Sequence, residues 1–600
     1  MSNSPRIVAL VKQVPRFEEM SLGPGGRINR EGVELEMNPY CRRAVTTAHE
    51  LAGEHGGESI VVTLGPAQAE DSLREAIACG VKRGVLLSDP ACAGSDTLAT
   101  AHALRSVLAT LGDVDLILCG KNSVDADTGQ VGPELAQLLD LPFAGPAKDL
   151  EVDFAQRTFR AQCETDDGSR IVEGPLPAVI SAAERLCAPS KAPQDLRDEV
   201  DASQITKLTT ADVEGDRWGF DASPTRVGDT RLIEHGRSPQ MLSGPVEEQV
   251  VKATAMLGDR GVLDVDDESK GQVPAPGASE AHTAAAAGSA NEVWAVAELS
   301  QPRMVAELAQ AACRLSGELG ASARVWLTGA GSEGMPALPA GLAGAVLFET
   351  AGDVADEDIA AALAALIASE RPSVVILAST APGREIASRI AATLDLGLTG
   401  DAVELDIVDG RLVAWKPAFG GQLVAAITSE SDVQMATVRP GVLPIDETVP
   451  VADVPVERLR VSGSGRVTVS EREVTDDIEA LAVADAVVAV GMGVDPGDYE
   501  ALDDLVDVLR AELAATRKVT DRGWLPRSRQ IGITGRAVAP RLFVSIGASG
   551  KFNHSVGFRA AHTVVAINPD ERAPVFRHCD IGIVATWQDA VPLLVNALHA

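Results

Sequence analysis

Glycine-rich turns follow apolar, strand-like runs in the last third of the chain. The segments are DAVVAVGMGV at 485–494, SRQIGITGR at 528–536, RLFVSIGASG at 541–550 and HTVVAINPD at 562–570. Such turns let the backbone approach a phosphate group, and a following helix presents N–H groups and the positive end of its dipole. The spacing of several turns predicts a dinucleotide site, although the Gly-Met-Gly at 491–493 alone is also compatible with a simple tight turn.

A second polar loop, VDADTGQVG at 124–132, lies between an apolar run and an amphipathic segment. Thr128 and the backbone N–H groups of residues 129–131 can donate to phosphate oxygens at the start of a helix. Asp125 and Asp127 are also ordinary turn residues at a helix start, so the loop alone leaves both interpretations open.

Apolar runs alternate with alanine-rich amphipathic segments, and this alternation predicts the elements that position the turns. The first four apolar runs lie at 7–11, 59–65, 84–89 and 115–120. Fully apolar strands between helices are typical of a parallel sheet covered on both faces. The alternation returns from residue 292 and again from 485, and a helix ending in LAATRKVTDRGW, at 513–524, is expected between two of the glycine-rich turns.

Two strand–turn–helix segments resemble each other. LILCGKNSVDADTGQVGPELAQLLDLPFAG begins at residue 116 and VVILASTAPGREIASRIAATLDLGLTGD begins at 374, so that Gly129 matches Gly383. This separation is too long for a solenoid repeat and suits duplicated domains, although any two strand–turn–helix units share some likeness. We therefore expect two related, doubly wound parallel-sheet α/β domains before the C-terminal part.

A change in composition separates the two halves of the chain. Residues 265–290 are acidic and rich in small residues, with almost nothing to bury, which is typical of a linker. The expected organisation is a domain at 1–262, a linker at 263–290, a second domain at 291–468 and a Rossmann-like domain at 469–600.

Charge and cysteine content argue against several classes of function. The 600 residues carry a formal net charge of −34, which disfavours binding to nucleic acid or anionic membranes. The eight cysteines form no C-x-x-C pair, so they are expected to be reduced and no metal site is indicated. Without an apolar signal core or an apolar stretch of about 20 residues, we expect a cytoplasmic protein with no stable membrane insertion.

The motifs carry a specific resemblance. SRQIGITGR, IGASGKFNH and AINPDERAPVFRHCDIGIVA resemble the FAD-binding signature of electron transfer flavoprotein large subunits, and WKPAFGGQLVAAI and QMATVRPGV resemble that subunit's first domain. VALVKQVP, MNPYC, VTLGP and GKNSVDADTGQVGPELA resemble the small subunit. The chain is thus similar to a natural fusion of a small (beta) subunit followed by a large (alpha) subunit. This resemblance implies two adenine nucleotide alpha hydrolase-like domains and a C-terminal FAD-binding domain.

The resemblance implies roles for residues of the C-terminal part. Arg517 matches an arginine over the flavin ring, where a fixed cation would favour the anionic one-electron-reduced form. Thr534 matches a hydroxyl that bonds flavin N5, and His554 matches a residue near the C2 carbonyl, where a protonated imidazole would raise the flavin potential. The remaining implied FAD contacts are Gly535, next to Thr534; Ser549 and Gly550, in the phosphate and ribityl loop; and Asn568, at the adenosine end.

The chain departs from the family pattern at several of these motifs. Thr586 replaces an acidic residue, Asn553 replaces a glutamine, Met492 replaces an arginine, and Lys551 and Phe552 replace small or aliphatic residues. The lost anion and the added lysine are each expected to shift FAD affinity and potential by about 1 kcal/mol.

The small-subunit-like part resembles a site that holds AMP in most of the family and a second FAD in its electron-bifurcating branch. The residues that match it are Ala9, Asn38, Cys41 and Thr63, at the adenosine, and Asp125, Thr128, Gly129, Gln130 and Val131, at the phosphate. The D-x-D-T-x-Q-V-G-P form of the loop favours the branch that includes bifurcators, but it does not decide between AMP and FAD, because non-bifurcating relatives share it.

The implied function is that of an electron carrier. It would accept electrons from partner flavoprotein dehydrogenases on bound FAD and pass them to an acceptor such as a quinone oxidoreductase. The loop at 187–200 matches the family's docking loop but carries acidic residues instead of lysines, with Lys191 near the anchor position and Leu196 farther on. The alternatives are a bifurcating oxidoreductase with a second FAD and a nucleotide-binding protein without a redox role.

Overall fold

The computed structural model describes residues 4–599 except for 17–20, 23–27, 30–33, 167, 233–236, 264–290, 330–334, 352–353, 419–422, 447, 475–479, 482–483, 533–534 and 537. The chain forms two compact units. The larger unit contains residues 1–232 and 283–473, and the smaller, C-terminal unit contains residues 233–282 and 474–600. Residues 264–290 of the expected linker lie outside the described part.

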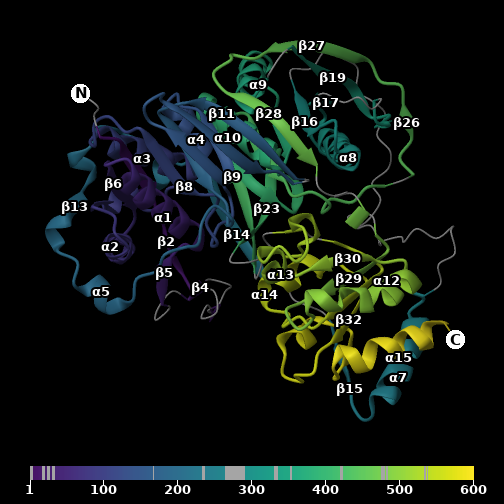
Figure 1. Cartoon of the computed structure of the whole chain (residues 1–600). Coiled ribbons are helices and arrows are strands. Elements are labelled where there is room, and N and C mark those ends of the chain that lie inside the picture. Colours follow the sequence, from purple (N-terminus) through teal and green to yellow (C-terminus); the bar gives the residue numbers. More distant parts are fainter. Residues whose placement is uncertain are drawn as a thin grey trace. The chain divides into compact units, whose positions relative to one another are not determined.

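The first sheet of the larger unit has ten strands (Figure 1). In spatial order they are β13 (Ile205–Leu208), β7 (Arg83–Leu87), β6 (Glu58–Leu64), β1 (Arg6–Leu10), β8 (Leu116–Gly120), β12 (Ala178–Ala182), β9 (Phe143–Asp153), β10 (Thr158–Glu164), β11 (Gly168–Pro175) and β28 (Thr468–Val474). Neighbours from β13 to β9 pair in parallel, and β9, β10 and β11 pair antiparallel. The helices of this part are α1 (Pro39–Glu54), α2 (Glu70–Ala78), α3 (Thr97–Ala109), α4 (Val131–Leu138), α5 (Gln194–Asp198) and α6 (Gly219–Ala222).

This sheet is buried on both faces, as the apolar runs predict. Ile7 and Ala9 of β1 belong to one hydrophobic cluster, whereas Val8 and Leu10 belong to another. Because successive side chains of a strand point to opposite faces, each face of the sheet has its own core.

The second sheet of the larger unit has the same topology as the first. Its order is β21 (Leu398–Ala402), β25 (Gln434–Val438), β20 (Val374–Ala378), β16 (Glu292–Glu298), β17 (Ser322–Thr328), β19 (Leu342–Ala351) and β27 (Val456–Ser462), all parallel. These strands correspond one to one, in space and along the chain, with β9, β12, β8, β1, β6, β7 and β13. The helices are α8 (Pro302–Leu319), α9 (Asp356–Glu370) and α10 (Ala381–Leu394). This correspondence confirms the two related parallel-sheet domains.

The two halves of the larger unit exchange strands. β14 (Thr225–Leu232) from the first half pairs antiparallel with β24 (Leu423–Ser429), which continues to β23 (Arg411–Ala418) and β22 (Glu404–Val408). In return, β28 of the second half lies beside β11 in the first sheet. The remaining pairs are β2 (Gln13–Pro15) with β5 (Leu35–Met37), β3 (Ser21–Leu22) with β4 (Ile28–Asn29), and β18 (Leu338–Pro339) with β26 (Val451–Ala452). Each half therefore completes a sheet of the other.

The C-terminal unit is built on a six-stranded parallel sheet. Its order is β15 (Gln240–Leu242), β33 (Ile581–Ile583), β32 (Thr563–Ile567), β31 (Leu542–Ile546), β29 (Ala486–Val490) and β30 (Glu512–Ala515). The helices are α7 (Val246–Asp259), α12 (Asp503–Leu509), α13 (Arg517–Asp521), α14 (Phe552–Ser555) and α15 (Trp587–His599).

Two expectations need correction in this unit. The domain expected at 1–262 does not stay together, because β15 extends the C-terminal sheet beside β33 and α7 packs against α15, as the teal and yellow helices of Figure 1 show. The helix expected at 513–524 is wrong over its first residues, because Glu512–Ala515 form strand β30 beside β29 and bury their alanines there. Only Arg517–Asp521 are helical within that segment.

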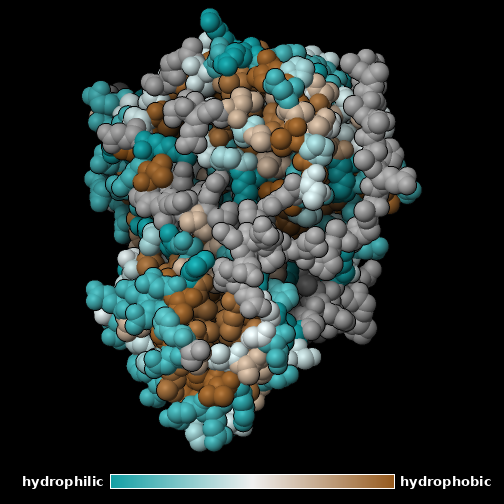
Figure 2. Space-filling model, turned by 90° about the vertical axis from the view of Figure 1, so that its right-hand side faces the viewer, coloured by the Kyte–Doolittle hydropathy of each residue, from teal (hydrophilic) through white to brown (hydrophobic). Residues whose placement is uncertain are grey.

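The surface is mixed in hydropathy on the face that Figure 2 shows. Figure 2 shows one face, on which hydrophilic residues surround separate hydrophobic patches. Among the described residues, no helix has both the length and the apolar character needed to cross a membrane.

Candidate functional site

The strand order of the C-terminal sheet reverses at β29. From β29 the chain adds β30 on one side and then β31, β32 and β33 on the other. In an open parallel sheet, the crevice outside the carboxyl ends of the strands at such a switch point is the usual ligand site. Three of the predicted turns leave β29, β31 and β32 at this edge, which we call the β29–β32 edge (residues 491–493, 516–517, 547–550 and 568–570).

Glycines at the β29–β32 edge pack too closely for side chains. The N–H of Gly491 donates to the carbonyl of Ile546 at 2.8 Å, and a Cβ on Gly491 would lie 2.4 Å from Cα of Ala548. Gly550 has a φ of +64°, and its Cβ would lie 2.2 Å from Cα of Val575. The turns after β29 and β31 therefore bring their backbones into direct contact, which is the arrangement that the glycine spacing predicts.

Arg517 is the first residue of α13 and follows β30, so the structure places this cation at the same edge. Its Nε donates to Asp521 at 3.3 Å, and 30% of its side chain is exposed. A half-buried guanidinium at a ligand edge can act on a bound ring electrostatically, because it is only partly screened by water.

His554, in α14, is buried and points one ring nitrogen at a backbone carbonyl. Nδ1 lies 2.9 Å from the oxygen of Ile531, which can only accept, so Nδ1 carries the proton in the neutral ring. Nε2 is buried and has no hydrogen-bond partner among the described residues. Burial lowers the pKa of His554 to about 4. The resemblance leads us to expect a protonated imidazole. In the ligand-free chain the imidazole is instead neutral at pH 7, because burial removes the water that would stabilise its charge.

Asn568 holds the turn after β31 in place. Its Nδ2 donates to the carbonyl of Ala548 at 2.9 Å, and its Oδ1 accepts from the N–H of Asp570 at 2.9 Å. Ser549 is exposed, and its carbonyl accepts from the N–H of Val575 at 3.0 Å. Asn568 thus fixes the loop that the sequence predicts to bind phosphate.

The remaining predicted FAD contacts and departures are only partly described. A Cβ on Gly535 would lie 2.2 Å from the carbonyl oxygen of Gln530, so this position is closely packed. Thr534 and the side chain of Asn553 lie outside the described part.

Two of the departures have structural partners. The hydroxyl of Thr586 donates to Asp589 at 2.6 Å, at the start of α15, where a threonine is a common helix cap. Nη1 of Arg522 lies 2.8 Å from Sδ of Met492. A guanidinium from the C-terminal end of α13 therefore lies at the turn after β29.

The first sheet of the larger unit has a second switch point, at β1. The chain adds β6 and β7 on one side of β1 and β8 and β12 on the other. The loops after β1 and β8 flank this point, and we call residues 11–12, 63–65 and 120–131 the β1–β8 edge. The polar loop predicted to bind phosphate belongs to this edge.

Asn38 connects the adenosine-side residues to that loop. It directly precedes α1, its Nδ2 donates to the carbonyl of Asn122 at 2.9 Å, and its Oδ1 accepts from the N–H of Val124 at 3.1 Å. Its Nδ2 also lies 3.3 Å from Sγ of Cys41, a thiol whose pKa is raised by burial. The structure places Asn38 and Cys41 next to each other at the start of α1.

Ala9 and Thr63 lie in neighbouring strands and are fully buried. The hydroxyl of Thr63 donates to the carbonyl of Val11 at 2.8 Å, so it fixes the end of β1. Both residues therefore lie beneath the surface, in the strands that carry the β1–β8 edge.

The loop after β8 is tied to the loop after β1 by an ion pair that the sequence reasoning missed. Nζ of Lys12 lies 2.8 Å from the carboxylate of Asp125. Burial tends to raise the pKa of Asp125, but the charge of Lys12 outweighs it and holds the pKa below its usual value. Lys12 directly follows the apolar run of the first strand, and that position was the available signal.

The backbone before α4 has N–H groups that are available to a hydrogen-bond acceptor. Gly129 has a φ of +67°, and α4 begins at Val131 after Thr128, Gly129 and Gln130. Within the described residues, no hydrogen bond is made by the N–H of Gly129 or Gln130. The side chain of Gln130 is engaged, since its Oε1 accepts from the hydroxyl of Thr97 at 2.9 Å. The free N–H groups at a helix start can bind phosphate oxygens.

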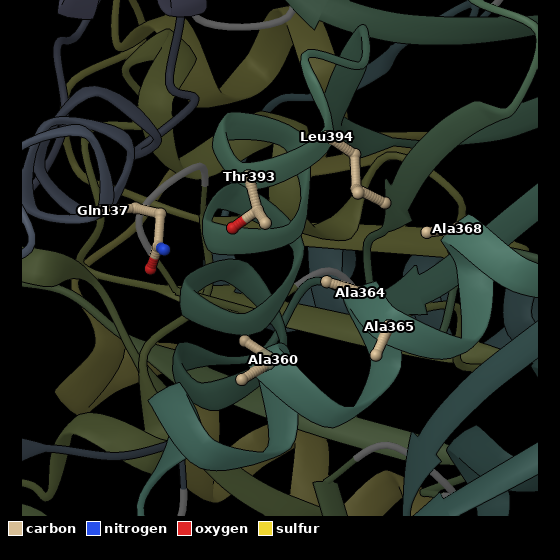
Figure 3. A pocket seen from close by; sticks show the side chains of 8 residues that line it. Gln137, Ala360, Ala364, Ala365, Ala368, Thr393 and Leu394 are labelled. Carbon is tan, nitrogen blue, oxygen red and sulfur yellow. The ribbon is translucent and has the colours of Figure 1, made fainter.

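A hollow of about 270 Å³ lies between α9 and α10 (Figure 3). Its lining residues are Gln137, Ala360, Ala361, Ala364, Ala365, Ala368, Thr393 and Leu394. None of these residues is ionisable and none belongs to either edge, so we do not assign the chemistry to this hollow.

The residues at the β29–β32 edge fit a flavin dinucleotide. The buried, unpartnered Nε2 of His554 requires a hydrogen-bonding neighbour, Arg517 supplies a cation, and the glycine turns leave backbone close to the crevice. These features define a nucleotide-binding α/β protein with one switch-point site in each unit.

Comparisons with known proteins identify the family. The electron transfer flavoprotein domain matches residues 25–213 and 272–477, and the electron transfer flavoprotein FAD-binding domain matches residues 480–559. Protein FixB of Azorhizobium caulinodans is 37% identical over 256 residues, which cover 41% of this chain and 69% of that protein. The electron transfer flavoprotein subunit beta of Thermoanaerobacterium thermosaccharolyticum is 33% identical over 261 residues, covering 43% of this chain and 99% of that protein. Protein FixA of Rhizobium meliloti is 34% identical over 284 residues, covering 45% and 97%.

The chain belongs to the electron transfer flavoprotein family, as a fusion of its beta-type and alpha-type subunits. It is an electron carrier whose C-terminal unit binds FAD.

Proposed function

We propose that this protein accepts electrons from partner flavoprotein dehydrogenases and passes them to a downstream acceptor such as a quinone oxidoreductase. FAD, when bound, supplies the redox chemistry. The proposal is supported by the match of the C-terminal unit to the FAD-binding domain, in which Arg517 and the close-packed glycine turns follow strands of the sheet and the buried Nε2 of His554 has no hydrogen-bond partner among the described residues.

We assign tasks to five residues at or near the β29–β32 edge. Arg517 stabilises negative charge on the bound ring by Coulomb attraction. His554 keeps its proton on Nδ1, so its buried Nε2 can only accept a hydrogen bond and would need a donor on the bound ring. Asn568 and Gly550 hold the turn that receives the phosphates, and Thr534 bonds N5 according to the family resemblance.

The β1–β8 edge is proposed to hold AMP, with a second FAD as the alternative. Support comes from the free N–H groups of Gly129 and Gln130. It also comes from the loop after β8, which Asn38 holds at Val124 and Lys12 holds at Asp125. A fixed, charge-balanced loop suits a permanently bound nucleotide, because little conformational entropy remains to be lost on binding.

The proposed docking loop is held rigidly. Arg197 of α5 is buried and pairs with Glu75 at 2.8 Å and with Asp71 at 3.1 Å. Leu196, next to it, is 46% exposed. A fixed loop that presents one exposed leucine among acidic residues favours a partner with an apolar pocket and a basic rim.

Arg517→Gln tests the proposed task of the arginine. The flavin potential is expected to fall by on the order of tens of millivolts, because the reduced, more negative ring loses a nearby cation. FAD affinity is measured in the same protein by fluorescence titration. Lys518→Gln is the matched control, since it removes the same charge from an exposed neighbour in α13. Equal potentials in the two variants would contradict the role of Arg517.

Electron transfer is tested with the FAD-loaded chain in a stopped-flow spectrophotometer. We expect the flavin absorbance to bleach when a reduced partner flavoprotein dehydrogenase is added, and to recover when a quinone oxidoreductase is supplied. Flavin that stays oxidised with such dehydrogenases but bleaches directly with NADH would favour the bifurcating alternative instead.

A further inference from the structure

Charged side chains of the second half gather where β21, β23 and β25 come together, and all but Arg384 are largely buried. Asp401 is 2% exposed, and Nε of Arg439 donates to its carboxylate at 3.1 Å. Nη2 of Arg384 lies 3.6 Å from the other oxygen of the same carboxylate. Lys416, in β23, is 7% exposed.

This group lies against residues 124–132 of the first half, the loop that is predicted to bind phosphate and that we call the phosphate loop. Nε2 of Gln130 donates to the carbonyl of Leu398 at 3.4 Å. A Cβ on Gly400 would lie 2.7 Å from Nε2 of Gln130 and 3.6 Å from Cα of Thr128. The loop before α4 therefore packs directly on β21, the strand that carries Asp401.

Lys416 is the cation of this group that has no hydrogen-bonded partner among the described residues. Arg439 and Arg384, by contrast, both pair with Asp401. The carboxylates nearest to Nζ of Lys416 are those of Asp401 and Asp127, the latter in the phosphate loop. Burial lowers the pKa of Lys416, and the two carboxylates oppose that effect. Buried ammonium groups are normally paired, because an unpaired one is costly.

The balance of charge favours an anion. Three cations, Lys416, Arg439 and Arg384, face two carboxylates, Asp127 and Asp401. Burial and the charge of Asp401 both raise the pKa of Asp127, which weakens its negative charge further. The site therefore carries excess positive charge beside the start of a helix whose first N–H groups are free.

We propose that Lys416 binds a phosphate oxygen of the nucleotide held by Thr128–Val131, so that the second half completes a phosphate site begun by the first. This rests on the proposed nucleotide site at the β1–β8 edge. The ligand class is a nucleoside 5′-monophosphate, free or as part of a dinucleotide. Its phosphate supplies the acceptor that Nζ lacks, and the N–H groups of Gly129 and Gln130 supply further donors.

The test compares AMP with adenosine, which lacks the phosphate. Calorimetric titration of the nucleotide-free full chain gives both dissociation constants for wild type, Lys416→Met, Lys416→Gln and Lys416→Arg. The Met and Gln variants are expected to weaken AMP binding roughly tenfold or more and to leave adenosine binding unchanged. Arg keeps the charge and should retain most of the preference for AMP.

Lys207→Met is the matched control, because it removes a lysine of the same unit whose side chain is 63% exposed and paired with Glu70. The readout is the ratio of AMP to adenosine affinity, which a lower folded fraction does not change. An unchanged ratio in both Lys416→Met and Lys416→Gln overturns the proposal but leaves the nucleotide site standing. Wild-type protein that binds neither AMP nor FAD at this edge overturns both.

Discussion

His554, near the β29–β32 edge, is buried among aromatic side chains. Its ring centroid lies 5.1 Å from that of Phe558 and 6.2 Å from that of Phe543. Two aromatic neighbours and a single carbonyl partner leave the imidazole little that could stabilise a positive charge. The imidazole is therefore neutral in the ligand-free protein. It could become protonated only if a bound ligand stabilised the positive charge.

His554→Asn tests this description through stability. The native pKa is about 4 against an ordinary value of 6.5, so the unfolded state binds the proton more tightly. Stability should be fully present above pH 6.5 and be lost as pH falls toward 4, by about 3 kcal/mol from this group alone. Urea unfolding of the FAD-free protein between pH 4 and 7 should show this slope in wild type and lack it in His554→Asn. Identical slopes would contradict the assignment.

Glu134 offers a pH test in the larger unit. Burial, reinforced by the charge of Asp96, raises its pKa well above the ordinary 4.5, and Thr97 bonds one of its oxygens. Because the folded pKa is raised, its stabilising effect is present at low pH and is lost as pH rises above 4.5.

Glu134→Gln keeps the shape of the neutral acid and cannot ionise. Its melting temperature should match wild type at pH 4.5 and exceed it increasingly toward pH 8, as measured by calorimetry. A variant that is less stable than wild type at pH 8 would show that the ionised carboxylate is favourable there.

Elements at both edges depend on turns that only glycine can make. In Gly550→Ala, a positive φ and a contact of 2.2 Å with Val575 act together, and the expected loss is about 2 kcal/mol or more in the stability of the C-terminal unit. FAD affinity should fall with it, because the turn that Asn568 fixes would move. Both quantities are measured by thermal unfolding and fluorescence titration.

Gly523→Ala is the control for backbone strain. Gly523 has a φ of +71° in the same unit, but an added Cβ would meet nothing within 4 Å, so the expected loss is only about 1 kcal/mol. Equal losses at the two positions would show that the close packing at Gly550 contributes nothing.

Periodicity predicted most elements because burial dominated their sequences. The expected run at 7–11 forms β1 at Arg6–Leu10, and the run at 115–120 forms β8 at Leu116–Gly120. The helix expected at 513–524 was wrong at its start because three short apolar residues suit either a helix or a buried strand, and pairing with β29 decided the outcome.

Other features had no local signal. The contact of Lys12 with Asp125 spans a switch point, and the charge of Lys416 acts on Asp127 only because the two halves pack together. Such pairings depend on tertiary contacts, so a single sequence identifies the residue types but not the partners. The glycine turns were predictable because their conformational requirement is local.

At the scale of the whole molecule, strand exchange makes the two fused parts interdependent. β14 completes a sheet of the second half, β28 extends the first sheet, and β15 with α7 extends the C-terminal sheet. The covalent connection near the expected linker is therefore not what holds these elements in place.

Co-expression of residues 1–262 and 283–600 as separate chains should give a stable complex that co-purifies. Shortening the first chain to 1–232 removes β15 and α7, and with them Val250 and Leu257, each contributing roughly 1.5–3 kcal/mol on burial. The melting temperature of the C-terminal unit should then drop by several degrees or more. Unchanged melting after this truncation would contradict the observed grouping of residues 233–262.

The central claim is that this chain is an electron carrier with FAD in its C-terminal unit, and the content of bound nucleotides tests it most directly. The measurement is acid release of nucleotides from the purified chain, followed by chromatographic quantification of FAD and AMP per polypeptide. The account predicts one FAD and one AMP. Two FAD per chain would replace the simple carrier with the bifurcating alternative, and no flavin even after reconstitution would contradict the account.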